Sequence, residues 1–176
     1  IAGDLVIADG AVWTKGSGTA TFDGVTQFMS DANNTPNNLG NALINSTVMT
    51  VTTDAIFTSV QISLGGKNIL NTGKTLAITG ALTITGELEM VDDSVVDVGG
   101  DVTVSGTLDM IGSARLKMEG DLSFSGTLEA SATSRIDLDG GSAQTISGAA
   151  TPVFNSLFCS SSATVFNLTA TINDTL

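Results

Sequence analysis

The chain has 176 residues, with 18 Asp or Glu against six Lys or Arg, so its formal net charge is −12. It contains no His and a single Cys, which excludes histidine-based acid–base catalysis, an internal disulfide and paired-cysteine metal motifs. So few basic residues disfavour binding to nucleic acid, and no apolar run approaches the ~20 residues of a membrane-spanning helix. We therefore expect no nucleic-acid partner and no membrane span.

Residues 1–40 are expected to form the irregular N-terminal part of a single domain that spans residues 1–176. Residues 1–12 have a strand-like pattern in which Leu5 and Ile7 are apolar. Residues 13–24 read Trp-Thr-Lys-Gly-Ser-Gly-Thr-Ala-Thr-Phe-Asp-Gly and are followed by Gln27. Residues 31–40 are rich in Asn and contain Pro, which predicts a turn-rich loop that leaves the regular structure.

A 20-residue repeat organises residues 41–140, and it is clearest in the segments 80–86, 100–106 and 120–126. Each segment places two apolar residues and two hydroxyl residues alternately between glycines. Alternation with a period of two indicates strands and not helices. The apolar positions align in six columns: Leu82, Val102 and Leu122; Ile84, Val104 and Phe124; Leu88, Leu108 and Leu128; Met90, Met110 and Ala130; Val96, Leu116 and Ile136; Val98, Met118 and Leu138.

The repeat is expected to continue less regularly on both sides of these units. One step of twenty towards the N-terminus places Ile62, Leu64, Gly66, Leu76 and Ile78 in the columns, and a second step adds Ala42, Ile44, Val48, Ile56 and Val60. Beyond Gly140 the period lengthens, because residues 145–148 follow their counterpart by 22 positions. Residues 141–176 are therefore predicted to be irregular C-terminal rungs that end in an alternating strand over 166–172.

The predicted fold is all-β: a right-handed parallel β-helix, or β-solenoid, with about 20 residues and three short strands per rung. Strands this short gain stability when identical rungs stack and pair their backbones. Seven or eight rungs spaced about 4.8 Å apart would form a rod of roughly 35–40 Å. The right hand follows from the general crossover rule. A meander sandwich is the alternative, but the constant spacing favours the solenoid.

The segment 13–24, together with Gln-Thr-Ile-Ser-Gly at 144–148 and Phe-Asn-Ser-Leu at 154–157, resembles repeats of large secreted β-helical surface proteins of bacteria and archaea. That family includes adhesin-like and filament-forming proteins, so the resemblance implies a parallel β-helix exposed outside the cell and transfers no site residue. The regular middle is also similar to bactofilins, which are cytoskeletal β-helices. The abundance of Thr and Asn and four glycosylation sequons favour the extracellular interpretation; the sequons begin at Asn33, Asn45, Asn167 and Asn173.

The outward acidic residues Glu89, Asp109 and Glu129 should form one column, with Glu87 beside it. Like charges stacked at rung spacing repel one another, and calcium could neutralise them through carboxylate oxygens. The alternative is screening by water and flexible side chains. We expect no other cofactor.

A second outward column combines Asp97, Lys117 and Asp137, whose charges alternate in sign and need no ion. Arg115 and Arg135 lie two positions before Lys117 and Asp137, which suggests local charge balance.

Other outward features point to remote alternatives. Regular hydroxyl ranks resemble ice-binding faces, but Ser replaces Thr in half of the ranks; their members are Thr83, Thr85, Thr103, Ser105, Ser123 and Ser125. The Asp92–Asp93 pair is the only acidic pair that invites comparison with polysaccharide-active β-helical enzymes. The minimal rungs offer no loops to build a cleft, so we expect no enzyme. Cys159 is interpreted as a buried small hydrophobe, with an intermolecular link as the alternative.

The expected function is structural: an extracellular or cell-surface subunit that self-associates head to tail into a filament. The reason is that the end rungs of a solenoid expose unpaired backbone groups, and neither end contains an amphipathic capping helix. The residues expected to mediate assembly are Phe166, Leu168, Ala170, Ile172, Leu5 and Ile7. The alternative is an adhesin stalk or a surface module that binds glycan or calcium.

Overall fold

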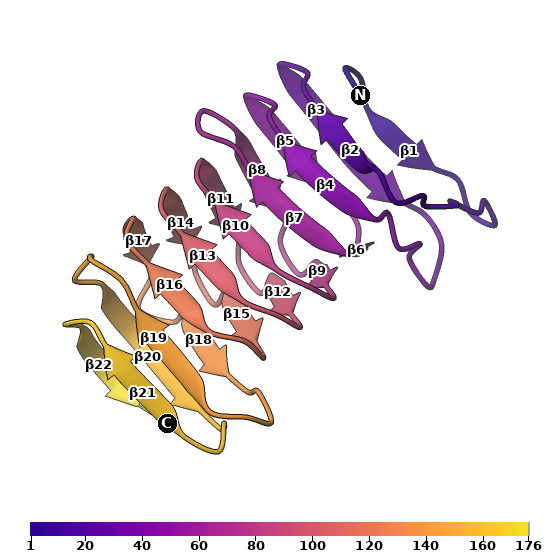
Figure 1. Ribbon diagram of the computed structural model, residues 1–176. Helices are drawn as coiled ribbons and strands as arrows, with labels where there is room; N and C mark the ends of the chain where they lie inside the picture. The colour runs from indigo at the N-terminus through magenta and orange to yellow at the C-terminus, as the bar shows by residue number, and fades with distance from the viewer. Residues whose placement is uncertain (176) are drawn as a thin grey trace.

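The computed structural model describes residues 1–175, and these form three parallel sheets with no helix (Figure 1). Sheet A comprises β1 (Leu5–Ile7), β3 (Thr26–Asp31), β5 (Val48–Val51), β8 (Lys67–Leu70), β11 (Glu87–Met90), β14 (Thr107–Met110) and β17 (Thr127–Ala130). Sheet B comprises β2 (Thr19–Phe22), β4 (Asn41–Ile44), β7 (Ser59–Ile62), β10 (Leu82–Ile84), β13 (Val102–Val104), β16 (Leu122–Phe124), β19 (Gln144–Ser147) and β21 (Thr164–Asn167). Sheet C comprises β6 (Ala55–Phe57), β9 (Thr75–Ile78), β12 (Val95–Val98), β15 (Arg115–Met118), β18 (Arg135–Leu138), β20 (Val153–Cys159) and β22 (Thr171–Thr175).

The regular rungs run from sheet B to sheet A to sheet C, and each strand pairs in parallel with its counterparts in the rungs before and after it. The eight strands of sheet B mark eight rungs. The predicted β-solenoid with three short strands per rung is therefore confirmed; its right hand stays a prediction. Within residues 1–175 no helix is long and apolar enough to cross a membrane.

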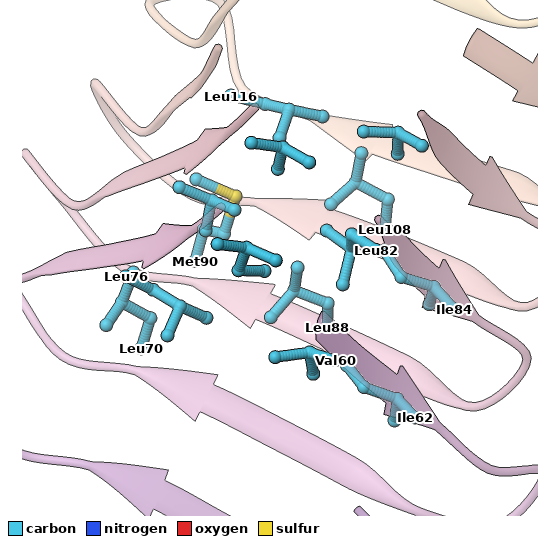
Figure 2. Close-up of a cluster of buried hydrophobic side chains, with 14 of the residues drawn as sticks. Val60, Ile62, Leu70, Leu76, Leu82, Ile84, Leu88, Met90, Leu108 and Leu116 are labelled. Carbon is cyan, nitrogen blue, oxygen red and sulfur yellow. The ribbon is translucent and has the colours of Figure 1, made fainter. Parts of the chain in front are cut away.

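The core is a narrow column between the three sheets, and its middle follows the predicted 20-residue register. Leu82 pairs with Val102 and Val102 with Leu122, and the other five predicted columns align in the same way. Figure 2 shows side chains such as Leu76, Leu82 and Leu88 directed from the three sheets towards one another. Because every rung buries the same face, the apolar contacts continue along the rod.

A stack of glycines explains why each repeat needs Gly at the corner between sheets B and A. A Cβ atom at Gly86 would overlap the carbonyl oxygen of Gly66, and Gly106 and Gly126 have the same relation to the glycine one rung earlier. The backbones of successive rungs therefore approach too closely at this corner for any side chain.

The register departs from twenty before β10, and this overturns several predicted positions. Leu82 pairs with Val60 and Ile84 with Ile62, so the corner after β7 holds two extra residues. Leu64, predicted to lie in the core, is instead 82% exposed on that corner. Val48 and Ile56 are also displaced outward, because their neighbours occupy the inward positions; those neighbours are Met49, Val51, Ala55 and Phe57.

The register after β18 also differs from the prediction. Ile146 pairs with Leu122, a spacing of 24, so it continues the column of Leu122 and not that of Phe124. The predicted strand over 166–172 is two strands, β21 and β22, separated by a corner at 168–170. Near the N-terminus only Leu5–Ile7 of the strand-like residues 1–12 forms a strand.

Two buried glutamines secure the irregular corners, and each follows an Asp-Gly pair, at residues 23–24 and 139–140. The Gln144 amide donates to the carbonyls of Met118 (3.0 Å) and Gly120 (2.6 Å), and its oxygen accepts from Gly140 N–H. The Gln27 amide donates to the Ile1 and Gly3 carbonyls, and its oxygen accepts from Gly24 N–H. Each side chain therefore satisfies backbone groups where the regular ladder is interrupted.

The predicted loop over 31–40 exists, but it is held against the solenoid. Buried Asp31 accepts hydrogen bonds from the backbone and side chains of Asn33 and Asn37, and these asparagines in turn contact residues 10–13. Burial raises the pKa of Asp31, but these hydrogen bonds outweigh that effect, so the pKa lies below its usual value.

Candidate functional site

The predicted acidic column lies on the outer face of sheet A. Glu89 pairs with Asp109 and Asp109 with Glu129, so the three carboxylates are stacked in consecutive rungs. Lys67, one rung earlier, reaches Glu87 and Glu89 with both N–O distances at 2.6 Å. Burial lowers the pKa of Lys67, but the hydrogen bonds and charges of the two glutamates outweigh it and raise the pKa overall. A cation from the neighbouring Glu87 position therefore pairs with this column at its N-terminal end.

Asp109 is the carboxylate of this column that burial and the neighbouring negative charges disfavour. Its pKa is raised by partial burial first and then by the negative charges of Glu129, Glu89 and Glu87. Carboxylate oxygens of Glu87, Glu89 and Asp109 lie within 4.8 Å of one another, whereas exposed Glu129 lies at the opposite end. Three such oxygens are the kind of ligand that calcium takes, but Lys67 already pairs with two of the groups. The calcium site at Glu89, Asp109 and Glu129 stays a prediction.

Sheet B carries the hydroxyl ranks. Thr83, Thr103, Ser123 and Ser147 pair in consecutive rungs and face outward. The rank ends towards the N-terminus, where Gln61 pairs with Thr83. An ice-binding face would therefore be limited to a short stretch of mixed Thr and Ser.

A shallow groove of about 570 Å³ follows the glycine corner between sheets B and A. The exposed Leu64 contributes to its lining together with the hydroxyl residues Thr47, Thr85, Ser105 and Thr107. The glycine stack produces this groove, because no side chain fills the corner.

The outer face of sheet C contains a compensated charge network. Asp97, Lys117 and Asp137 are in register as predicted, but Lys117 pairs with Asp97 (3.1 Å) and Asp139 (3.3 Å) and not with Asp137. Asp137 is buried between the guanidinium groups of Arg115 and Arg135. The hydrogen bond to Asp97 is the first cause that raises the pKa of Lys117, and burial opposes it. This network balances charge locally.

The Arg135 guanidinium also lies over the Phe158 ring, 5.2 Å from the ring centroid. Such cation–π contact adds to the hydrogen-bonded ion pair that holds Asp137.

The Asp92–Asp93 pair forms a corner and not a cleft. Asp93 adopts a left-handed backbone conformation (φ 56°), and its carboxylate accepts a hydrogen bond from the Ser113 hydroxyl one rung later. The Asp92 carboxylate accepts from Ser113 N–H at 3.3 Å. These contacts join adjacent corners.

Cys159 is exposed, so its interpretation as a buried residue is wrong. It pairs with Leu138 in the preceding rung, but β22 extends along β20 only as far as Leu157. Within residues 1–175, no strand of the following rung therefore covers the Cys159 side chain.

The four sequons differ in the availability of their amide nitrogens. The Asn33 amide donates to Ala11 and Asp31, and the Asn173 amide donates to Asn155 at 2.8 Å. Asn45 and Asn167 are exposed. These two sequons are therefore the more accessible acceptors.

The predicted assembly residues lie in the two end rungs. Ile7 is buried and Leu5 half-buried in β1. At the other end Phe166 is 42% exposed although it continues the inward column of Leu122 and Ile146. Leu168, Ala170 and Ile172 are half-buried against the core. The C-terminal core column is thus uncovered within the described residues.

A further groove, which the sequence did not predict, lies at the C-terminal edge of sheet A. Sheet A ends at β17, whereas sheets B and C each continue for two more rungs. The groove measures about 410 Å³ and lies between residues 126–128 and residues 149–153. We call it the β17 groove. The only signal for it in the sequence is a smaller number of residues between the neighbouring strands. This signal can be recognised only when the correct register is known.

Comparison with known proteins found no match: no family model, no curated protein and no solved structure matches the chain.

Proposed function

We propose that this chain is a structural, non-catalytic subunit that associates end to end with copies of itself and forms a filament on the cell surface. The observation that carries the proposal is the position of the exposed large apolar residues. Ten large apolar residues are exposed in the described part of the chain. All of them except Leu64 and Ile111 lie within residues 1–28 or 153–166. A rod that exposes apolar side chains mainly at its two ends favours contact between ends.

Sheet B offers the most direct route for this contact, because its two edge strands lie near the two ends of the rod. The strand β2 lies at one edge of the sheet and β21 at the other. Ala20, Ala42 and Val60 begin the inward column that Ile146 and Phe166 complete. If sheet B continued from one copy into the next, Phe166 of the first copy would lie opposite Ala20 of the second. This arrangement would place a large side chain against a small one. Heterologous contact of this kind produces an open filament.

The non-catalytic part of the proposal rests on composition and on the outward side chains. The chain has no His, and its outward ladders consist of hydroxyls and of acids, several of which are held in ion pairs. The proposed extracellular location rests on composition and on the resemblance to secreted β-helical repeats.

Negative-stain electron microscopy and light scattering over a range of concentrations test the association. The wild type should form rods longer than one subunit. Phe166→Asp should abolish them because it places a charge in the uncovered column, whereas Asn167→Asp adds the same charge on the outward face of β21 and should not. A wild type that stays monomeric at high concentration would overturn the proposal.

The second candidate, a calcium-binding surface module, is favoured by the proximity of Glu87, Glu89 and Asp109. Calcium should then raise the melting temperature, and Glu89→Gln should remove this effect. An unchanged melting temperature would reject this candidate and leave the filament proposal intact. A glycan-binding stalk would use the groove along the glycine corner.

A further inference from the structure

The rung that contains β19 is shorter than the regular rungs on the side of sheet A. Ile136 follows Leu122 by 14 positions, whereas Leu157 follows Ile146 by only 11, although these residues occupy matching register positions. The chain thus lacks three residues where the next strand of sheet A would form. Residues 148–152 cross this side without a strand, and the β17 groove lies beside them.

The edge of β17 next to this groove keeps unpaired backbone groups. Thr127 N–H donates to Gly106 and Ser131 N–H to Met110, so alternate residues face the preceding rung. The backbone N–H and C=O groups of Leu128 and Ala130 consequently point towards the groove. The Asn155 amide donates to the Ala130 and Ser131 carbonyls, both at 2.6 Å, which covers one end of the edge. No described strand pairs with β17 at Leu128.

The side chains around the groove are apolar on the inward side and acidic on the outward side. Leu128 is only half-buried, whereas its counterparts Leu88 and Leu108 are fully buried. Ala149, Ala150, Pro152 and Val153 add apolar lining, and Thr127 and Thr151 add hydroxyl groups. On the outer face Glu129 ends the acidic column, and Lys67, which pairs with Glu89, lies at the other end. Among residues 1–175, no cation pairs with Glu129 at the end next to the groove.

We propose that the β17 groove accepts a short extended segment of a partner protein, which adds to β17 as the missing strand of sheet A. Its inward residue would be apolar and cover Leu128, and its outward residue would be basic and lie beside Glu129. Backbone hydrogen bonds to the strand edge would supply affinity, and these two side chains would supply selectivity. This inference is independent of end-to-end association, because β17 precedes the C-terminal rung by two rungs.

Fluorescence anisotropy with two labelled peptides tests the proposal. The first repeats residues 125–132 around β17 with Lys in place of Glu (Ser-Gly-Thr-Leu-Lys-Ala-Ser-Ala), and the second keeps Glu. The Lys peptide should bind the wild type about fivefold more tightly, because opposite charges beside each other stabilise a strand pair and like charges oppose it. Glu129→Lys should reverse the preference. Glu119→Lys, an equal charge change on an exposed corner outside the groove, should not.

Hydrogen exchange at the Leu128 amide provides the second readout, since peptide binding should slow it. Equal binding of both peptides, or no added protection at Leu128, would overturn the proposal. Protection of Leu128 that rises with protein concentration in the absence of peptide would assign the groove to a second copy and equally overturn it. Repeating the titration in the Phe166→Asp variant separates this result from end-to-end association.

Discussion

Leu108 and Leu128 occupy the same column of sheet A, one rung apart, but their surroundings differ. Leu108 lies between β11 and β17 and is fully buried, whereas Leu128 lies at the last strand of the sheet and is half-buried. The residue type and the alternation are identical at the two positions. Burial in a solenoid is therefore determined by the presence of a following rung as much as by the residue itself.

Replacing these two leucines with alanine should reduce stability by different amounts, and the loss at Leu108 should be the largest effect predicted. Leu108→Ala should lower the free energy of unfolding by about 2–5 kcal/mol, because it leaves a cavity in a closed core. Leu128→Ala should cost about 1–2 kcal/mol, because its side chain is already partly in water. Urea denaturation measures both values, and equal losses would contradict the comparison.

Gln144→Ala should be nearly as damaging as Leu108→Ala. It leaves the Met118 and Gly120 carbonyls and the Gly140 N–H without a partner in a buried corner. The expected loss is about 2–4 kcal/mol in the same denaturation experiment. The matched variant Gln61→Ala removes an exposed amide and should change stability by less than about 0.5 kcal/mol. A Gln144 variant as stable as the Gln61 variant would exclude the proposed bridging role.

Asn68→Leu should stabilise the protein, because Asn68 interrupts the same leucine column. It pairs with Leu88, it is buried, and its side-chain oxygen has no hydrogen-bond partner. Replacing it with Leu should raise the free energy of unfolding by about 1–2 kcal/mol. Calorimetry can compare it with Asn34→Leu, an exposed control. A lower melting temperature for Asn68→Leu would mean that the amide has a partner.

Asp109→Asn should give the smallest effect, and the effect should depend on pH. A raised pKa means that the folded state binds the proton more tightly than the unfolded state. The stabilising contribution of protonated Asp109 is therefore lost as the pH rises from the usual value of 3.8 through the folded pKa.

The Asn variant should consequently gain up to about 1 kcal/mol at pH 7 and nothing below the usual pKa. Asp9→Asn, on an exposed N-terminal corner, is the control. An Asp109 variant whose stability relative to wild type is the same at both pH values would contradict the repulsion within the column.

The sequence predicts the regular rungs well, because residues 82–138 repeat without insertion or deletion. Leu64 is apolar and fits a spacing of twenty, so no local property reveals the two extra residues that expose it. Cys159 stands in an inward position, but its exposure depends on how far β22 extends.

Some features of the candidate sites could likewise be predicted from the sequence, and others could not. The stacking of Glu89, Asp109 and Glu129 follows from the period, whereas the role of Lys67 depends on side-chain reach across a rung. The β17 groove depends on a deletion of three residues in a segment with no clear repeat, and it requires the three-dimensional register to be seen.

Native-state hydrogen exchange at the Leu108 and Leu128 amides, measured by NMR at low protein concentration, tests most directly whether sheet A has a free edge at β17. The free edge predicts that the Leu128 amide exchanges at least about tenfold faster than the Leu108 amide, because no described strand pairs with β17 on that side, whereas Leu108 lies between two paired strands. Equal protection of the two amides would contradict it, since it would mean that another segment already covers β17.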